Sequence, residues 1–179
     1  MGQGPPCLNG GETMARRSTD KQGEPSAYEK ALGLLARREH SARELKAKLS
    51  QRGFAADENA AALERLQSKD FQNDARFGEM LVRSRLEGGY GPRWIVAELR
   101  THGIGEDKAT ALIAAAEPDW AALVRRQLRR RYGGKPAATL AERSKRAAFL
   151  LRRGFDASTV KLAVGASVSG VAESSDEAD

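Results

Sequence analysis

Five arginines between positions 125 and 131 are the residues of this sequence best placed to bind a partner. They are Arg125, Arg126, Arg129, Arg130 and Arg131. On an α-helix, residues 125 and 129 lie one turn apart, as do residues 126 and 130, and like charges at this spacing repel each other. An anionic partner would relieve the repulsion, because a guanidinium can donate two parallel hydrogen bonds to a phosphate or a carboxylate. This run therefore predicts an anion-binding surface.

The positive charge extends beyond these five residues. Residues 120–165 contain twelve Lys and Arg but two Asp and Glu, whereas residues 166–179 contain four acidic residues and no basic ones. The whole chain has a net charge of +6. A solvated basic face is the alternative interpretation, but the scarcity of acids within 120–165 favours contact with an anion. The further candidate contacts are Lys135, Arg143, Lys145, Arg146, Arg152 and Arg153.

Catalytic signatures are missing from the sequence. His40 and His102 lie 62 residues apart, each at the end of a predicted helix, where histidine commonly stabilises the helix dipole. No HExxH, GxSxG or glycine-rich phosphate loop is present. Cys7 is the single cysteine, so one chain can form neither a disulfide nor a cysteine-based zinc site. We therefore predict a protein that is not an enzyme and has no metal, cofactor or small-molecule substrate.

The elements that must position the basic residues follow from an internal repeat. Gly53-Phe54, Gly103-Ile104 and Gly154-Phe155 recur at intervals of 50 and 51 residues, and apolar residues recur around each pair. Arg146 departs from this register, since the two earlier copies have Leu45 and Ile95 at its position. A repeat of this length is typical of helical arrays. The sequence predicts an all-α protein of three tandem three-helix repeats, forming an elongated, curved array in which neighbours bury apolar faces together.

Helix start signals support this division. Ser26, Ser41 and Thr139 each precede a Glu by three residues, as in a capping box, and Gly91-Pro92 is suited to open a helix. Asp57 is predicted to cap the third helix of the first repeat. Tyr90, Trp94 and Tyr132 are available to stack on bases, but packing within thin helical cores is the favoured interpretation.

The predicted units are a disordered leader at 1–25, repeats at 26–72, 73–119 and 120–165, and a disordered acidic tail at 166–179. Met14 is an alternative start to Met1. No apolar run reaches the roughly 18 residues of a membrane span. With a lone cysteine and no secretory signal, we predict a monomer in the cytoplasm.

Two sets of motifs lie in the first two predicted repeats. The first set is Tyr28-Glu29-Lys30-Ala31-Leu32-Gly33-Leu34-Leu35-Ala36-Arg37-Arg38-Glu39-His40-Ser41, Glu44-Leu45, Leu49 and Arg52-Gly53-Phe54. The second set is Asp74-Ala75-Arg76-Phe77, Arg83-Ser84-Arg85, Gly91-Pro92-Arg93-Trp94-Ile95 and Glu98-Leu99. Together they resemble the RecX family, bacterial regulators of the RecA recombinase. The resemblance runs from about residue 28 to residue 165 and is strongest up to Gly103.

The resemblance implies a regulator that binds the RecA–DNA filament and usually inhibits recombinase and coprotease activity in DNA repair and the SOS response. It adds Arg76, Arg83, Arg85 and Arg93 to the candidate contacts, and it leaves direct contact with DNA open. Two alternatives follow from the basic segment alone: a general nucleic-acid-binding helical module, and a helical-repeat scaffold for an acidic protein.

Overall fold

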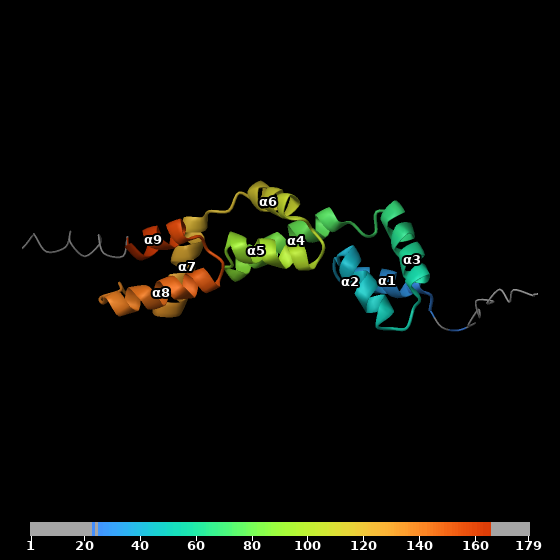
Figure 1. Cartoon of the computed structure of the whole chain (residues 1–179), viewed down its shortest axis with the longest axis horizontal. Coiled ribbons are helices and arrows are strands. Elements are labelled where there is room, and N and C mark those ends of the chain that lie inside the picture. The colour runs from blue at the N-terminus through green and yellow to red at the C-terminus, as the bar shows by residue number, and fades with distance from the viewer. Residues whose placement is uncertain (1–22, 24, 166–179) are drawn as a thin grey trace, which may run out of the picture.

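The computed structural model describes residue 23 and residues 25–165, and this part of the chain folds into nine α-helices and no strands. The helices follow one another in three groups of three, which form an elongated, curved row (Figure 1). Their bounds are α1 Ala27–Leu35, α2 Ala42–Ser50, α3 Ala56–Ser68, α4 Asp74–Gly88, α5 Pro92–Thr101, α6 Glu106–Ala115, α7 Trp120–Tyr132, α8 Leu140–Arg152 and α9 Ala157–Gly165. The fold agrees with the predicted repeats. The predicted leader and acidic tail lie outside the described residues, except for residues 23 and 25.

Each repeat has an apolar core of its own. Leu45, Leu49 and Leu66 are fully buried in the first core, and Phe77 and Ile95 lie in the second. The third core contains Val124, Phe149, Leu150, Phe155, Val160 and Val164. The extensive helix packing occurs within repeats. The expectation that neighbouring repeats bury apolar faces together is met only locally, at Trp120, which packs against both the second and the third core. Elsewhere each three-helix unit closes its short apolar stripes on itself.

The three repeated glycines adopt a left-handed backbone conformation, each just after the second helix of its repeat. Gly53, Gly103 and Gly154 have φ angles of 88°, 88° and 83°, in the left-handed region that favours glycine. The amide after each glycine donates to a carbonyl five residues earlier, as Ile104 does to Leu99 at 3.1 Å. Each step therefore ends the second helix of its repeat and returns an apolar residue toward the core.

The helix starts agree with the sequence in part. Ser26 and Glu29 form both halves of a capping box at α1. Ser41 and Thr139 accept a backbone hydrogen bond at α2 and α8, as expected. The prediction for Asp57 was wrong: Ala55 precedes α3, and Glu58 accepts the Ala55 amide at 2.9 Å.

Side chains connect the first repeat to the second. Arg76 Nε donates to Glu39 Oε1 at 2.8 Å, and the Ala42 amide donates to Asp74 Oδ1 at 2.9 Å. Gln72 Nε2 donates to the same Asp74 oxygen at 2.8 Å, and Ser41 Oγ lies 3.2 Å from His102 Nδ1. Ser41 and Gln72 are buried. We call this set of contacts the first junction.

Backbone contacts connect the second repeat to the third. The Gly91 amide donates to the Arg153 carbonyl at 2.8 Å, and the Arg93 amide donates to the Gly154 carbonyl at 3.1 Å. A Cβ atom on Gly91 would collide with the Gly154 carbonyl, and one on Gly154 with the Trp94 backbone nitrogen. We call this seam the second junction. It explains why glycine occupies both positions, since only glycine lets the two backbones approach so closely.

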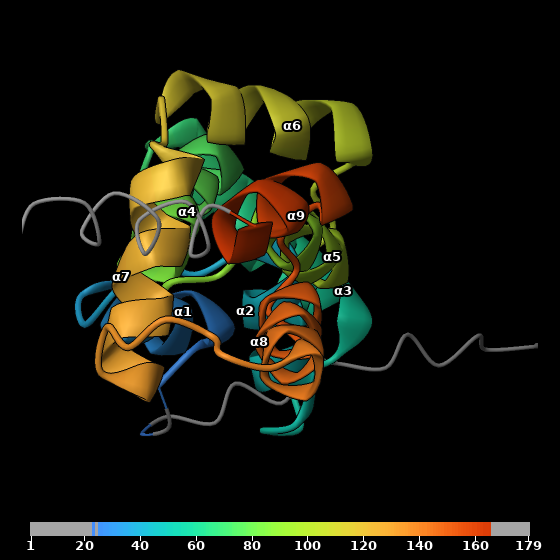
Figure 2. The ribbon, with the colours of Figure 1, turned by 90° about the vertical axis from the view of Figure 1, so that its left-hand side faces the viewer.

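The first helices of the three repeats share one side of the array. Viewed along the long axis, α1, α4 and α7 lie to the left, while α5, α8 and α9 lie to the right (Figure 2). Helix α7, which carries the arginine run, thus lies on the same side of the array as the first helices of the other repeats. Among the described residues, no helix is long and apolar enough to cross a membrane.

Candidate basic interface

Helix α7 presents four of its five arginines on the side opposite its buried residues. Its N-terminus is capped by Asp119, whose Oδ1 accepts the Ala122 amide at 2.8 Å. Val124 and Gln127 turn inward and are buried. The opposite side carries exposed Arg125, Arg126, Arg129 and Arg130, the arrangement expected of a helix with one apolar stripe.

Three of these arginines have no partner within the described chain. The side chains of Arg125, Arg129 and Arg130 form no ion pair or hydrogen bond among residues 25–165. We name these three residues the α7 basic face. Arg125 and Arg129 are one turn apart, and Arg130 follows directly, so the face concentrates positive charge that nothing described in the fold neutralises.

The repeat's own acids are occupied elsewhere. Glu142 Oε2 accepts the Ala138 amide at 2.8 Å, and Asp156 Oδ1 lies 3.8 Å from Arg93 Nε of the second repeat. In the first two repeats, by contrast, arginines are matched with carboxylates, such as Arg38 with Glu44 at 2.6 Å. The α7 basic face therefore stays cationic, because the third repeat has few acidic residues and these interact with other groups.

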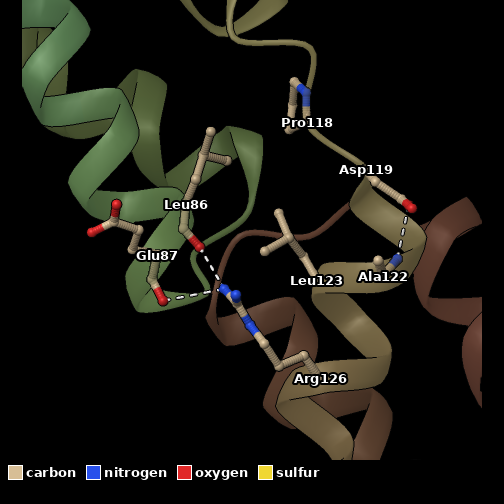
Figure 3. A pocket seen from close by; sticks show the side chains of 7 residues that line it. All are labelled: Leu86, Glu87, Pro118, Asp119, Ala122, Leu123 and Arg126. Atoms are coloured by element: carbon tan, nitrogen blue, oxygen red, sulfur yellow. Dashed lines mark hydrogen bonds between the residues drawn. The ribbon is translucent and has the colours of Figure 1, made fainter.

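Arg126 and Arg153, two of the basic residues predicted to contact a partner, instead bond to backbone carbonyls of the second repeat. Arg126 Nη2 donates to the carbonyls of Leu86 and Glu87 at 3.0 and 3.2 Å (Figure 3), and Arg153 Nη1 donates to those of Gly88 and Gly89 at 2.8 and 3.2 Å. These four carbonyls close the C-terminal turn of α4, where the helix dipole is negative and acceptors lack helical partners. Two arginines of the third repeat thus cap the second repeat.

Arg146 is buried, contrary to its expected role in contacting a partner. Its guanidinium donates to the Lys135 and Pro136 carbonyls at 2.6 and 3.3 Å and lies 4.9 Å from the Tyr132 ring centroid. Only 8% of the residue is exposed. Arg146 occupies the register of Leu45 and Ile95, so its aliphatic stem replaces their apolar side chains while its charge is bonded internally.

Two arginines predicted from the second repeat are also in ion pairs. Arg85 donates to both carboxylate oxygens of Glu98 at 2.6 Å, which lowers the pKa of Glu98 and raises that of Arg85. Arg76 contacts Glu39 and Asp70, and the hydrogen bond to Glu39 is the main cause of its raised pKa. Both arginines hold helices together in this structure.

The remaining candidate residues differ in whether their side chains have a partner within the described chain. Arg131 lies over the Phe149 ring, 4.8 Å from its centroid, and Arg143 Nε approaches the Ala137 carbonyl at 3.5 Å. Arg93 is mostly exposed beside Asp156. Exposed side chains without an ion pair or hydrogen bond in residues 25–165 are Arg83, Lys135, Lys145 and Arg152. These four remain candidate contacts for a partner.

The aromatic residues pack against protein groups. Tyr90 stacks on Trp94 with ring centroids 5.1 Å apart, and Tyr132 meets Phe149 edge-on at 6.1 Å. Arg153 lies over the Tyr90 ring at 5.1 Å, so this stack is part of the second junction. Packing, the favoured interpretation, agrees with these contacts.

The second junction itself was not predicted from the sequence. The signal that could have found it was Gly88-Gly89-Tyr90-Gly91, where Gly89 has a φ of 75° and abuts Gln127.

A pocket of about 320 Å³ borders the arginine run where α4 ends and α7 begins (Figure 3). Leu86, Pro118, Ala122 and Leu123 line it with apolar surface, and Glu87, Asp119 and Arg126 supply polar groups.

Among the described residues, no group of three or more His, Cys, Asp or Glu side chains lies close enough to hold a metal ion. The fold and the basic face together define a helical-repeat protein with a cationic surface on its third repeat.

Comparisons with known proteins show which family of helical-repeat proteins the chain belongs to. Profiles of the first, second and third three-helix domains of RecX match residues 27–66, 73–112 and 117–164. The chain belongs to the RecX family of regulatory proteins. It is 45% identical over 140 residues to the regulatory protein RecX of Xanthomonas campestris pv. campestris (strain B100), covering 78% of this chain and 86% of that one. The match to regulatory protein RecX of Stenotrophomonas maltophilia (strain R551-3) is 44% with the same coverage.

Solved structures have the same fold. A crystal structure of RecX from Lactobacillus salivarius superposes with a TM-score of 0.65 at 21% identity, over 78% of this chain and 93% of that one. A crystal structure of regulatory protein RecX gives the same TM-score at 23% identity, over 76% of this chain and 70% of that one. The three-helix repeat architecture is thus shared at low sequence identity.

Proposed function

We propose that this protein binds the RecA–DNA filament in the bacterial cytoplasm and modulates, usually by inhibition, RecA recombinase and coprotease activity. Membership of the RecX family supports the proposal. The structural observation that carries it is the unpaired α7 basic face on an elongated array of repeats. The protein acts as a monomeric regulator without catalysis of its own.

The shape and the charge distribution suit a filament. An elongated array can contact several adjacent subunits, and independent cores allow each repeat to keep its own fold along a curved surface. The α7 basic face provides guanidinium groups that bind carboxylate or phosphate with two hydrogen bonds each. The first two repeats, in which Arg38, Arg76 and Arg85 are paired with carboxylates, provide length and shape.

A charge reversal tests this proposal. The variant R125E/R129E/R130E alters three side chains without a partner in the described fold, so its helical content and melting temperature should match those of the unmodified protein. Its affinity for RecA filaments on single-stranded DNA should fall at least about tenfold, corresponding to about 1.4 kcal/mol. The readouts are filament binding, ATP hydrolysis, strand exchange and coprotease activity.

The matched control is K30E/R37E/K46E, which makes the same charge change on exposed, unpaired residues of the first repeat. It should keep most of the affinity. If the unmodified protein changes no RecA activity at saturation, the proposal fails. If both variants bind equally, the α7 basic face is a solvated surface.

A second candidate function is general binding of nucleic acid, which the unneutralised charge of residues 120–165 favours. It predicts tight binding to bare single-stranded DNA, with a logarithmic salt slope near 0.7 per phosphate contacted. Filament binding in the absence of appreciable binding to bare DNA would exclude this candidate.

A further inference from the structure

The α7 basic face lacks an internal counter-charge within the described residues. Arg125, Arg129 and Arg130 are exposed and unpaired. The two acids of the third repeat, Glu142 and Asp156, face the Ala138 amide and Arg93. A partner for this face must therefore come from outside residues 25–165, and it must be anionic.

The chain itself contains such a segment. Residues 166–179 read ASVSGVAESSDEAD and contain four acidic side chains, no basic ones and two valines. The acids are Glu173, Asp176, Glu177 and Asp179, all within the last seven residues. This concentration of negative charge complements the α7 basic face in sign and approximately in number.

The point of attachment permits contact. Residue 166 follows α9 directly, and α9 packs against α7 in the third core. Fourteen extended residues span up to about 45 Å, whereas the 13 residues of α7 are about 20 Å long. The segment can therefore reach any part of the α7 basic face within one chain.

We propose that residues 166–179 bind the α7 basic face intramolecularly and compete with the anionic partner of that face. Tethering gives the segment an effective concentration in the millimolar range, so a weak electrostatic contact suffices for substantial occupancy. Exposed ion pairs are individually weak and screened by salt, so the contact is reversible. The competition rests on the proposed function, whereas the intramolecular contact does not.

A probe in trans tests the contact without RecA. The probe is a fluorescein-labelled peptide of residues 166–179, titrated in 20 mM NaCl against full-length protein with the tail neutralised by E173Q/D176N/E177Q/D179N. We expect saturable binding. Binding to the unmodified chain should be at least about fivefold weaker, because its own tail occupies the face, and 0.5 M NaCl should abolish it.

Charge-reversal variants locate the contact. In the tail-neutralised background, R125E/R129E/R130E should abolish peptide binding, and K30E/R37E/K46E should retain at least half of the affinity. No binding to the tail-neutralised chain, equal binding to the unmodified chain, or equal loss in both triple variants would overturn the proposal.

Filament binding then separates this inference from the proposed function. Neutralising the tail should strengthen binding to RecA filaments about fivefold at low salt, because the competing segment is gone. Peptide binding without any effect on RecA would contradict the filament proposal and leave the contact intact. Filament binding with no response to tail neutralisation would contradict the competition.

Discussion

The two junctions of the array are built from different parts of the chain. At the first junction, side chains such as Arg76 and Asp74 reach across to Glu39 and the Ala42 amide. At the second junction, backbones touch at Gly91 and Gly154, and arginines cap the carbonyls at the end of α4. A side-chain contact can be lost singly, whereas a backbone seam depends on the absence of side chains.

This difference divides the basic residues by role. Arg126 and Arg153 belong by sequence to the same cluster as Arg125 and Arg152, yet the structure bonds the first two to α4 carbonyls. Arginines that are adjacent in sequence thus have different roles, since one of each pair bonds to the second repeat at the second junction and the other stays exposed on the surface. Mutations at the junctions should therefore affect stability, whereas those on the α7 basic face should affect binding.

The largest expected effect is at the second junction. Gly154→Ala places a Cβ against the Trp94 backbone in a left-handed conformation, and the two costs together should lower the free energy of unfolding by about 3 kcal/mol. Gly53→Ala is the matched control, because Gly53 has nearly the same φ with no atom within 4 Å of the added Cβ. Its cost should be about 1 kcal/mol. Urea denaturation measures both, and equal costs would remove the steric argument.

The arginine caps should have the next largest effect. Arg153→Met removes two hydrogen bonds to α4 carbonyls and should cost about 2 kcal/mol. Arg152→Met removes the same charge from an exposed residue with no partner in the described fold, so it should change stability by less than about 0.5 kcal/mol. Thermal melting of both variants tests whether bonding or charge matters, and identical melting temperatures would favour charge.

A smaller loss is expected at the first junction. Arg76→Met breaks the ion pairs with Glu39 and Asp70, which are partly exposed and screened by solvent, so it should destabilise the protein less than Arg153→Met does. Arg83→Met on the same helix is the control and should be nearly neutral. A larger loss for Arg76→Met than for Arg153→Met would reverse the ranking of the junctions.

The smallest expected effect is a pH dependence at His40 of the first repeat. Burial lowers the pKa of His40 below its ordinary 6.5 despite Glu44, whose carboxylate lies 3.0 Å away in ion-pair geometry, and Arg38 and Lys48 lower it further. The unfolded chain therefore binds the proton more readily, and stability should fall as pH drops below 6.5. Urea denaturation from pH 7 to pH 5 tests this. His40→Gln should flatten the profile over that interval, and an unchanged slope would contradict the assignment.

Carboxylates add a separate loss in more acidic solution. Hydrogen bonds from Arg85 lower the pKa of Glu98. At Glu44, burial opposes ionisation, but hydrogen bonds from Arg38 and His40 outweigh it and lower the pKa. Their contribution to stability is present above the ordinary value of 4.5 and is lost as pH falls through the lowered values. The two pH windows are therefore distinguishable.

Local signals predicted much of the fold. Gly53, Gly103 and Gly154 identified the repeat because a left-handed residue at a helix end requires glycine almost regardless of its surroundings. Asp57 was misassigned because several residues near a helix start are compatible with capping, and packing decides which one is used. The arginine run of α7 was visible from spacing alone, since its exposure follows from the apolar stripe on the other side of the helix.

The site was less predictable than the fold. Arg153 has the same residue type and local charge as Arg152, and the sequence has no signal that separates a capping guanidinium from a free one. Arg146 did have a signal of burial, because it occupies the register of Leu45 and Ile95, but its charge led to the opposite prediction. The partners of Arg146 and Arg153 are carbonyls of the 135–136 loop and of residues 88–89. Carbonyls are present at every residue, so composition cannot show which one a guanidinium meets.

The sequence by itself determined the three helical repeats, the glycine steps between their helices and the concentration of charge in the third repeat, because these depend on periodicity and local conformation. The tertiary structure alone decided that each repeat closes its own core, that two junctions differ in kind, and that Arg125, Arg129 and Arg130 stay unpaired in the described fold. These depend on which distant groups meet, and only the folded chain brings residues 86–91 beside residues 126 and 153.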